Sequence, residues 1–192
     1  HILHTQTAGS VDLIRKAKAA GQRVTCEINP WALFLGCEWS AIQRLGSYAL
    51  SYWVPEKNLP DLWEGLRDGT IDCVSTDHAP HELELKRKGW LLGPFGTRGL
   101  ETALPTLLTL MNRGELSLER LVEVFSKSPR RILQRSEFEH PSGVLFVDPA
   151  AVYAVTESEL PGVSSNSCFL GTPLHGKIML RAEPGRLFSR LS

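Results

Sequence analysis

The chain has 192 residues with 21 basic and 21 acidic side chains, and its 42% hydrophobic and 22% charged residues are ordinary globular values. The balanced charge argues against a nucleic-acid-binding protein and against a protein of acidic membranes, because both carry a basic excess. No apolar run approaches the roughly 20 residues of a membrane span. The four cysteines form no CxxC pair, so we expect reduced thiols in a cytoplasmic protein.

Strand-like and helix-like patterns alternate along residues 1–76. Each predicted strand is a short apolar run bounded by turn residues, and the predicted helices have apolar side chains at helical spacing. We expect Ser10 to cap the first helix and Gly21 to end it. The strands are predicted at residues 1–7, 23–29, 47–54 and 71–76, and the helices at residues 10–21, 38–45 and 59–67.

The pattern changes after residue 81. We expect Ser117 to cap a helix, and Pro105 is tolerable in the helix before it only in the first turn. The predicted elements are a charged, glycine-rich loop over residues 82–99, helices at residues 102–111 and 118–125, a further turn at 128–133, and short strands at residues 144–147, 151–155 and 177–180.

This order of elements predicts an α/β fold. Strands that alternate with helices form parallel sheets with right-handed crossovers. Chemistry in such sheets gathers at the carboxyl ends of the strands. His4, Glu27, Asn29 and Asp77 fall at those ends.

His4 and Asp77 are the leading candidates for chemistry. His1 and His4 are three residues apart and point to opposite faces of a regular strand, so they cannot bind one metal ion together. Asp77 ends an apolar strand, where a carboxylate can bind a divalent metal, act as a base or simply cap a turn. Spacing does not decide whether His78 and His81 contact an anionic substrate or solvent. Neither a Ser/His/Asp triad nor a glycine-rich phosphate loop is signalled.

Three segments carry a resemblance to a known family. HILHTQTAGSVDLIRKAKAAGQRVTCEINP, DGTIDCVSTDHAPH and FGTRGLETALPTLLTLMNRGELSLERLVEVFSKSPRRIL, in that order, resemble the C-terminal half of a dihydroorotase. Dihydroorotases are cyclic-amide enzymes of the amidohydrolase superfamily, close to hydantoinases and allantoinases. The likeness runs from His1 to about Leu133 and continues more weakly through the tail.

The resemblance implies the C-terminal half of a metal-dependent (β/α)₈ TIM barrel over residues 1–137 and a small C-terminal β segment over residues 138–192. It implies a zinc centre in which His4 is a ligand and Asp77 is both a ligand and the proton acceptor. His81 would hold the substrate carboxylate. The implied reaction interconverts dihydroorotate and N-carbamoyl-aspartate in pyrimidine biosynthesis by hydrolysis or formation of a cyclic amide bond.

The chain also departs from the pattern of the family. By the resemblance, Trp31 stands where the family has a metal-binding His, and an indole has no lone pair for a metal. Residues 52–56 replace a segment that shapes the substrate pocket. The paired His-x-His and the bridging Lys belong to the family's N-terminal half, and Glu27 is only a remote third ligand. We therefore expect that the chain alone does not hydrolyse dihydroorotate at a useful rate.

A whole barrel typically has about 250 residues, and the start at His1 is what a cut within a strand would give. Half a barrel leaves strand edges and an apolar face uncovered. The chain is therefore expected to be a fragment of a longer gene product, to pair with another copy as a homo-oligomer, or to be a noncatalytic dihydroorotase-like scaffold that assembles with aspartate carbamoyltransferase. The expected ligand is a small cyclic amide or ureido acid, and a hydantoinase or allantoinase relative stays an alternative.

Overall fold

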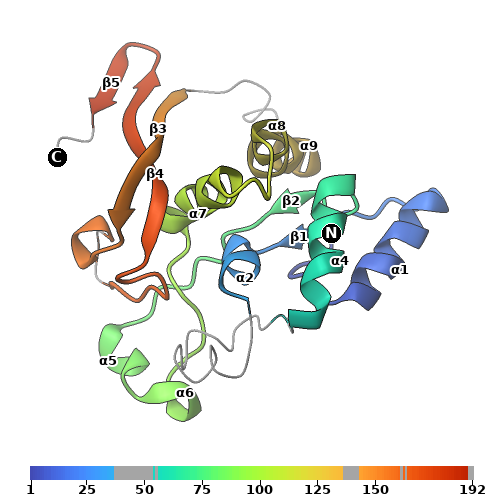
Figure 1. Cartoon of the computed structure of the whole chain (residues 1–192), viewed down its shortest axis with the longest axis horizontal. Helices are drawn as coiled ribbons and strands as arrows, with labels where there is room; N and C mark the ends of the chain where they lie inside the picture. The colour runs from blue at the N-terminus through green and yellow to red at the C-terminus, as the bar shows by residue number, and fades with distance from the viewer. Residues whose placement is uncertain (37–53, 55, 136–142, 161, 163, 190–192) are drawn as a thin grey trace.

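The computed structural model describes residues 1–36, 54, 56–135, 143–160, 162 and 164–189 (Figure 1). No helix in these ranges is long and apolar enough to cross a membrane. The elements are α1 (Ala8–Ala19), β1 (Glu27–Ile28), α2 (Pro30–Leu35), η2 (Glu56–Asn58), α4 (Leu59–Asp68), β2 (Cys73–Val74), α5 (Leu83–Lys86), α6 (Gly89–Leu92), α7 (Leu100–Asn112), α8 (Leu118–Val122), the π-helical turn η3 (Glu123–Lys127), α9 (Ser128–Leu133), β3 (Val144–Ala154), η5 (Glu157–Glu159), β4 (Pro173–Glu183) and β5 (Arg186–Ser189).

Three short parallel segments lie side by side in the N-terminal part. Strands β1 and β2 pair in parallel, with Glu27 opposite Cys73. The first segment joins them through a parallel bridge between Ile2 and Cys26 and through the hydrogen bond from the Thr5 amide to the Glu27 carbonyl, which is 2.8 Å long. The predicted parallel α/β arrangement is thus present, with strands shorter than predicted. The strand and helix predicted between residues 38 and 54 lie almost wholly outside the described residues.

Helices α1 and α4 supply much of the core that covers the parallel segments. The completely or almost completely buried side chains include Val11 and Ile14 of α1 and Leu62 and Leu66 of α4. Helix α1 begins at Ala8, so the prediction that Ser10 caps it was wrong. The cap is Thr7, because its extended backbone places its hydroxyl to accept the Ser10 amide at 3.1 Å.

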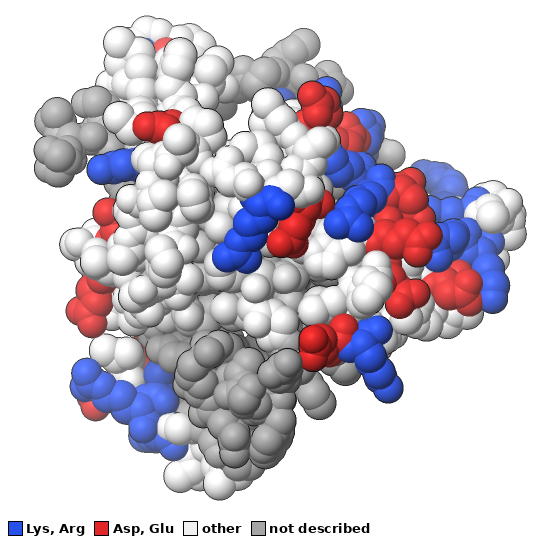
Figure 2. Space-filling view, viewed as in Figure 1, with Lys and Arg blue, Asp and Glu red and all other residues white. Residues whose placement is uncertain are grey.

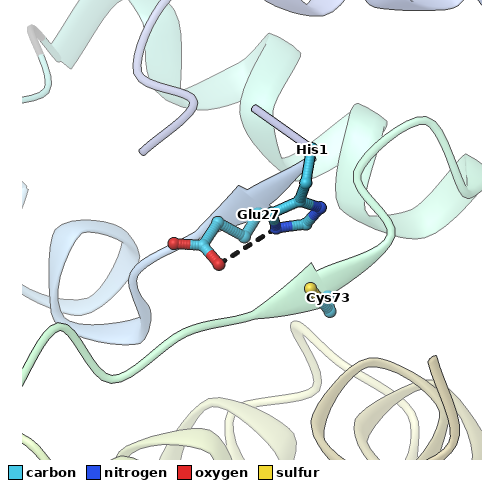
Figure 3. Close-up of side chains that lie close together, drawn as sticks. All are labelled: His1, Glu27 and Cys73. Atoms are coloured by element: carbon cyan, nitrogen blue, oxygen red, sulfur yellow. Dashed lines mark hydrogen bonds and ion pairs between the residues drawn. The ribbon is translucent and has the colours of Figure 1, made fainter. Parts of the chain in front are cut away.

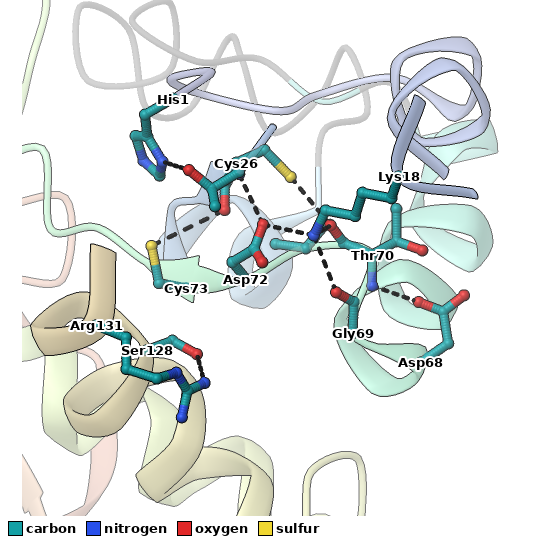
Figure 4. A network of polar contacts seen from close by, with 12 residues as sticks. His1, Lys18, Cys26, Asp68, Gly69, Thr70, Asp72, Cys73, Ser128 and Arg131 are labelled. Carbon is teal, nitrogen blue, oxygen red and sulfur yellow. Dashed lines mark hydrogen bonds and ion pairs between the residues drawn. The ribbon is translucent and has the colours of Figure 1, made fainter. Parts of the chain in front are cut away.

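A polar network ties the end of α1 to the strands (Figure 4). The Lys18 ammonium lies 2.7 Å from a carboxylate oxygen of Asp72 and donates to the Thr70 carbonyl at 2.8 Å. The same Asp72 oxygen accepts the Cys26 amide at 2.8 Å. Helix α4 ends one residue after its predicted end, where Gly69 takes the left-handed conformation with φ of 91°.

The segment predicted as a loop over residues 82–99 contains the short helices α5 and α6, so that prediction was wrong in part. The Lys86 side chain holds this segment in its folded form and is only 4% exposed. Its ammonium donates to the carbonyls of Pro94 and Gly96. A buried cation thereby fastens the second half of the segment to the first.

Helix α7 starts two residues before its predicted start. Pro105 is consequently its sixth residue and lies beyond the first turn, contrary to the prediction. Proline has no N–H to donate to the carbonyl four residues earlier. Ser117 caps α8 as predicted, with its hydroxyl accepting the Arg120 amide at 3.2 Å.

The C-terminal part is an antiparallel sheet in the order β3-β4-β5 (Figure 1). Strand β3 unites the two strands predicted at residues 144–147 and 151–155. Its pairing with β4 is irregular between Asp148 and Val152, where the prediction placed the break. Strand β5 was missed. Strand β4 packs on α7, where Gly176 lies against Leu108. The predicted domain boundary at residues 137 and 138 lies outside the described residues.

Charged side chains of both signs are interleaved over α1 and α4, while the face over β3 and β4 is mostly uncharged (Figure 2). Exposed apolar residues of this C-terminal sheet are Val144, Leu145, Phe146, Val152, Met179, Leu187 and Phe188.

Candidate functional site

His4 and Asp77 have an unusual backbone conformation at the ends of their strand segments. Their φ angles are 53° and 41°, and Gln134 is the one other described residue besides glycine with positive φ. Such angles are uncommon for residues with a side chain, although His and Asp adopt them more readily than most. Backbone strain of this kind clusters at functional sites, so it marks both residues as candidates.

The His4 ring is oriented by polar neighbours from β1 and the start of α2. Its Nδ1 lies 3.2 Å from Oδ1 of Asn29 and 4.0 Å from Oε1 of Glu27. Asn29 is 2% exposed and precedes α2 without capping it through its side chain. The side-chain oxygen of Asn29 is thus available to orient the His4 ring. Contacts of this kind hold metal-binding imidazoles in one tautomer.

Asp77 is half-buried, and its carboxylate makes no hydrogen bond or ion pair with any other described residue. The oxygens of a half-buried carboxylate without a protein partner are open to a ligand such as a cation. Its environment therefore suits a metal ligand or a base, as the sequence predicts.

His78 has a structural role through Nδ1, which is neither of the two roles that the sequence left open, contact with a substrate or with solvent. Its Nδ1 accepts the backbone amides of Gly99 and Leu100, at 3.3 and 3.2 Å. These amides lie at the start of α7, where N–H groups lack partners within the helix. His78 therefore caps α7 with an unprotonated Nδ1.

His81 is held from both its backbone and its ring. Its amide donates to Oδ1 of Asn166 at 3.0 Å, and its Nε2 lies 2.9 Å from the Phe95 carbonyl. Because a carbonyl only accepts, Nε2 carries the proton in this contact. The neutral ring then has only Nδ1 as an acceptor, so binding a carboxylate requires the doubly protonated imidazolium.

Sequence reasoning missed Asn166, which positions the segment that carries Asp77 and His81. This side chain is completely buried. Besides accepting the His81 amide, it donates from Nδ2 to the Ala79 carbonyl at 3.1 Å and accepts the Ser164 hydroxyl at 2.6 Å. The polar run at residues 164–167 is a weak signal, because nothing local reveals that Asn166 binds the His81 amide and the Ala79 carbonyl, which lie more than 80 positions earlier.

Trp31 lies in the first turn of α2, is 3% exposed and belongs to the hydrophobic core. Whether a ligand has been lost at this position stays a prediction. The predicted site residues do not form a complete metal centre by themselves: among the described residues, the one group of three close metal-binding donors is His1, Glu27 and Cys73 (Figure 3).

The described cysteines Cys26, Cys73 and Cys168 are free, in agreement with the expected reduced thiols. Burial raises the pKa of all three, to about 12 for Cys73 and about 11 for Cys168. Thiols with raised pKa values carry little thiolate at neutral pH, so none is an activated nucleophile as it stands.

Known proteins resemble the chain over nearly its whole length, although no protein-family model matches it. A dihydroorotase from Chlorobaculum tepidum is 37% identical over 186 residues, covering 93% of this chain and 42% of the relative. One from Trichlorobacter lovleyi is 37% identical over 194 residues, covering 97% and 45%. The chain thus spans less than half the length of these relatives.

Solved structures also resemble the chain over nearly its whole length. An L-hydantoinase from Arthrobacter aurescens superposes with a TM-score of 0.85 at 31% identity, over 97% of this chain and 44% of that one. An inactive dihydroorotase-like domain of a Chaetomium thermophilum CAD-like multifunctional protein has a TM-score of 0.74 at 22% identity, over 97% of this chain and 50% of that one. At that identity the second likeness supports the fold alone.

Proposed function

Because this chain is homologous to dihydroorotases over nearly its whole length, we propose that it is the C-terminal part of a cyclic-amide hydrolase and supplies one side of a shared active site. In this proposal residues 1–137 are the second half of a (β/α)₈ barrel and residues 138–192 are an appended β segment. The substrate is dihydroorotate or its ring-opened product N-carbamoyl-aspartate. The observation that carries the proposal is the positive φ of both His4 and Asp77, which end the two segments on either side of β1.

The donors present fit part of a zinc site. An imidazole and a carboxylate are ordinary zinc ligands, but catalytic zinc generally has three protein ligands. Among the described residues, no group of three close donors includes His4 or Asp77. When bound, zinc would act as a Lewis acid on the amide carbonyl. We propose that the remaining ligands come from a polypeptide part that corresponds to the half of the relatives that this chain does not match.

Each residue of this chain has a distinct task in the proposal. Asn29 fixes the His4 ring through the 3.2 Å contact with Nδ1. Asp77 accepts the proton of the attacking water, for which its unpartnered carboxylate is suited. His81, as the imidazolium, binds the substrate carboxylate while Nε2 stays on the Phe95 carbonyl.

The test is a chimera. The unmatched part of the Chlorobaculum tepidum dihydroorotase is joined to this chain, and ring opening of dihydroorotate is measured with zinc present. We expect turnover by the chimera, its loss in His4→Ala and Asp77→Asn, and none by the 192-residue chain alone. Robust turnover by the chain alone, abolished by Asp77→Asn, would contradict the shared site, and a folded but inactive chimera would contradict the enzymatic proposal.

A noncatalytic scaffold is the second candidate, favoured by Trp31 in the core and by the lack of a third close donor beside His4 or Asp77 among the described residues. Such a scaffold would bind a second copy of itself or an aspartate carbamoyltransferase. It predicts a chimera that folds and co-elutes with that transferase in gel filtration without opening dihydroorotate. Hydantoin, assayed beside dihydroorotate, tests the alternative substrate class.

A further inference from the structure

A second group of donors lies on the parallel segments and takes no part in the proposed reaction. It consists of His1, Glu27 and Cys73, one from each of the three neighbouring segments (Figure 3). One ligand atom from each side chain can be chosen so that all three lie within 4.8 Å of one another. An imidazole nitrogen, a carboxylate oxygen and a sulfur converge there.

Strand register explains why these side chains meet. Glu27 and Cys73 are directly paired, and paired residues of parallel strands project from the same face. Ile2 is bridged to Cys26 and shares the opposite face with it, so His1, one residue before Ile2, projects with Glu27. The convergence thus follows from the backbone rather than from one chance rotamer.

The His1 ring is already oriented as a metal-binding imidazole would be. Its Nδ1 lies 2.7 Å from the Thr25 hydroxyl, and its Nε2 lies 3.1 Å from Oε2 of Glu27. A hydrogen bond to one ring nitrogen fixes which nitrogen is presented to a cation, and this pattern recurs around bound metals. Glu27 and Cys73 are only 8% and 5% exposed, so a cation would be bound largely out of solvent.

We propose that His1 Nε2, the Glu27 carboxylate and the Cys73 sulfur form a binding site for a divalent cation of the zinc class, with the fourth position left to water. Sulfur together with imidazole selects zinc-like ions over magnesium or calcium. On binding, the Cys73 S–H bond is replaced by a sulfur–metal bond and the proton passes to solvent.

The electrostatics of the site act in both directions. Burial, together with the charges of Glu27 and Asp72, raises the pKa of Cys73 to about 12, which opposes the loss of its proton. The same two carboxylates attract a cation to the thiolate, and the sulfur–metal bond replaces the proton. The site adjoins the proposed catalytic centre through Glu27, which turns Oε2 to His1 and Oε1 to His4, 4.0 Å from His4 Nδ1. Cys73 distinguishes the two sites, because the proposed catalytic centre has no sulfur ligand.

The probe is Co²⁺, because a cobalt–thiolate bond gives a charge-transfer absorption in the near ultraviolet. The 192-residue chain is titrated with Co²⁺, and the bound ion is then displaced by Zn²⁺. We expect a band that saturates near one equivalent and disappears in Cys73→Ser. Cys26→Ser is the matched control and should keep the band, because the Cys26 sulfur instead contacts the Thr70 carbonyl at 3.3 Å.

Two further variants keep the test decisive if Cys73→Ser does not fold. Glu27→Gln and His1→Ala should each weaken cobalt binding by on the order of tenfold or more, since each loses a ligand. Asp77→Asn should leave the band unchanged. Absence of the band, its persistence in Cys73→Ser, or unchanged affinity in both His1→Ala and Glu27→Gln would overturn the site.

Discussion

Two candidate site residues, His4 and Asp77, have a strained backbone conformation. A positive φ costs of order 1–3 kcal/mol where the side chain is not glycine, and His4 and Asp77 both adopt one. Asn tolerates this conformation about as well as Asp. Asp77→Asn should therefore leave the fold intact while it removes the charge, which makes it the informative variant for any chemistry at these strand ends.

Asn166 provides a prediction at the same scale. Asn166→Ala should lower the free energy of unfolding by about 1–3 kcal/mol, because it leaves the His81 amide and the Ala79 carbonyl without their partner. Chemical denaturation measures the change. Asn112→Ala is the control, since Asn112 is exposed and makes one hydrogen bond, to the Pro149 carbonyl. Equal losses in the two variants would show that Asn166 does not hold the segment.

Lys86 gives the chain a pH-dependent stability. Burial lowers the pKa of its ammonium to about 8 from the usual 10.5. The folded state releases this proton first, so the unfolded state binds more protons between these values and the free energy of unfolding rises with pH. The Lys86 contribution is fully present above about pH 10.5 and is lost as the pH falls through 8.

The measurement is urea unfolding between pH 7.5 and 9.5 for the parent chain and for Lys86→Met. We expect the difference in stability between them to shift toward the parent as the pH rises. Taking the difference largely cancels the titration of the cysteines, whose raised pKa values act in the opposite direction. A difference that does not change with pH would contradict the role of Lys86.

At the scale of elements, the sequence predicts what depends on near neighbours. Helix α4, its Gly69 end and the Ser117 cap of α8 follow from residues a few positions apart. Strand β5 and the union of β3 could not be predicted, because pairing across the C-terminal sheet decides them. The same limit applies to the site. His4 and Asp77 stand out at strand ends, whereas Asn166 acts on a distant segment.

The packing of β4 on α7 depends on one glycine. A Cβ at Gly176 would lie 2.3 Å from Cδ1 of Leu108 and 2.9 Å from its Cβ. Gly176→Ala should therefore destabilise the fold by about 1–3 kcal/mol beyond the cost of its positive φ. Gly185→Ala isolates that backbone cost, because Gly185 also has positive φ but nothing within 4 Å of its Cβ position. Thermal unfolding of both variants compares the two, and equal losses would mean that α7 and β4 adjust freely.

Two of the exposed apolar regions among the described residues lie on sheet segments. One is the C-terminal sheet (Figure 2). The other is the first parallel segment, where Ile2 and Leu3 are 43% and 60% exposed. Among the described residues, this segment pairs with β1 on one side only. Unpaired edges and contiguous apolar surface favour association with another chain.

We therefore expect the isolated chain to self-associate, which gel filtration with light scattering measures as a mass that rises with concentration. Leu3→Lys should reduce this association, because a charge on an edge segment opposes pairing with another edge. Leu13→Lys is the matched control, since Leu13 is 68% exposed on helix α1, away from a strand edge. A parent chain that stays monomeric and unfolds cooperatively would contradict the uncovered edge. If both substitutions reduced the association equally, the cause would be general surface hydrophobicity. The two leucines are both largely exposed, and only Leu3 lies on the edge segment.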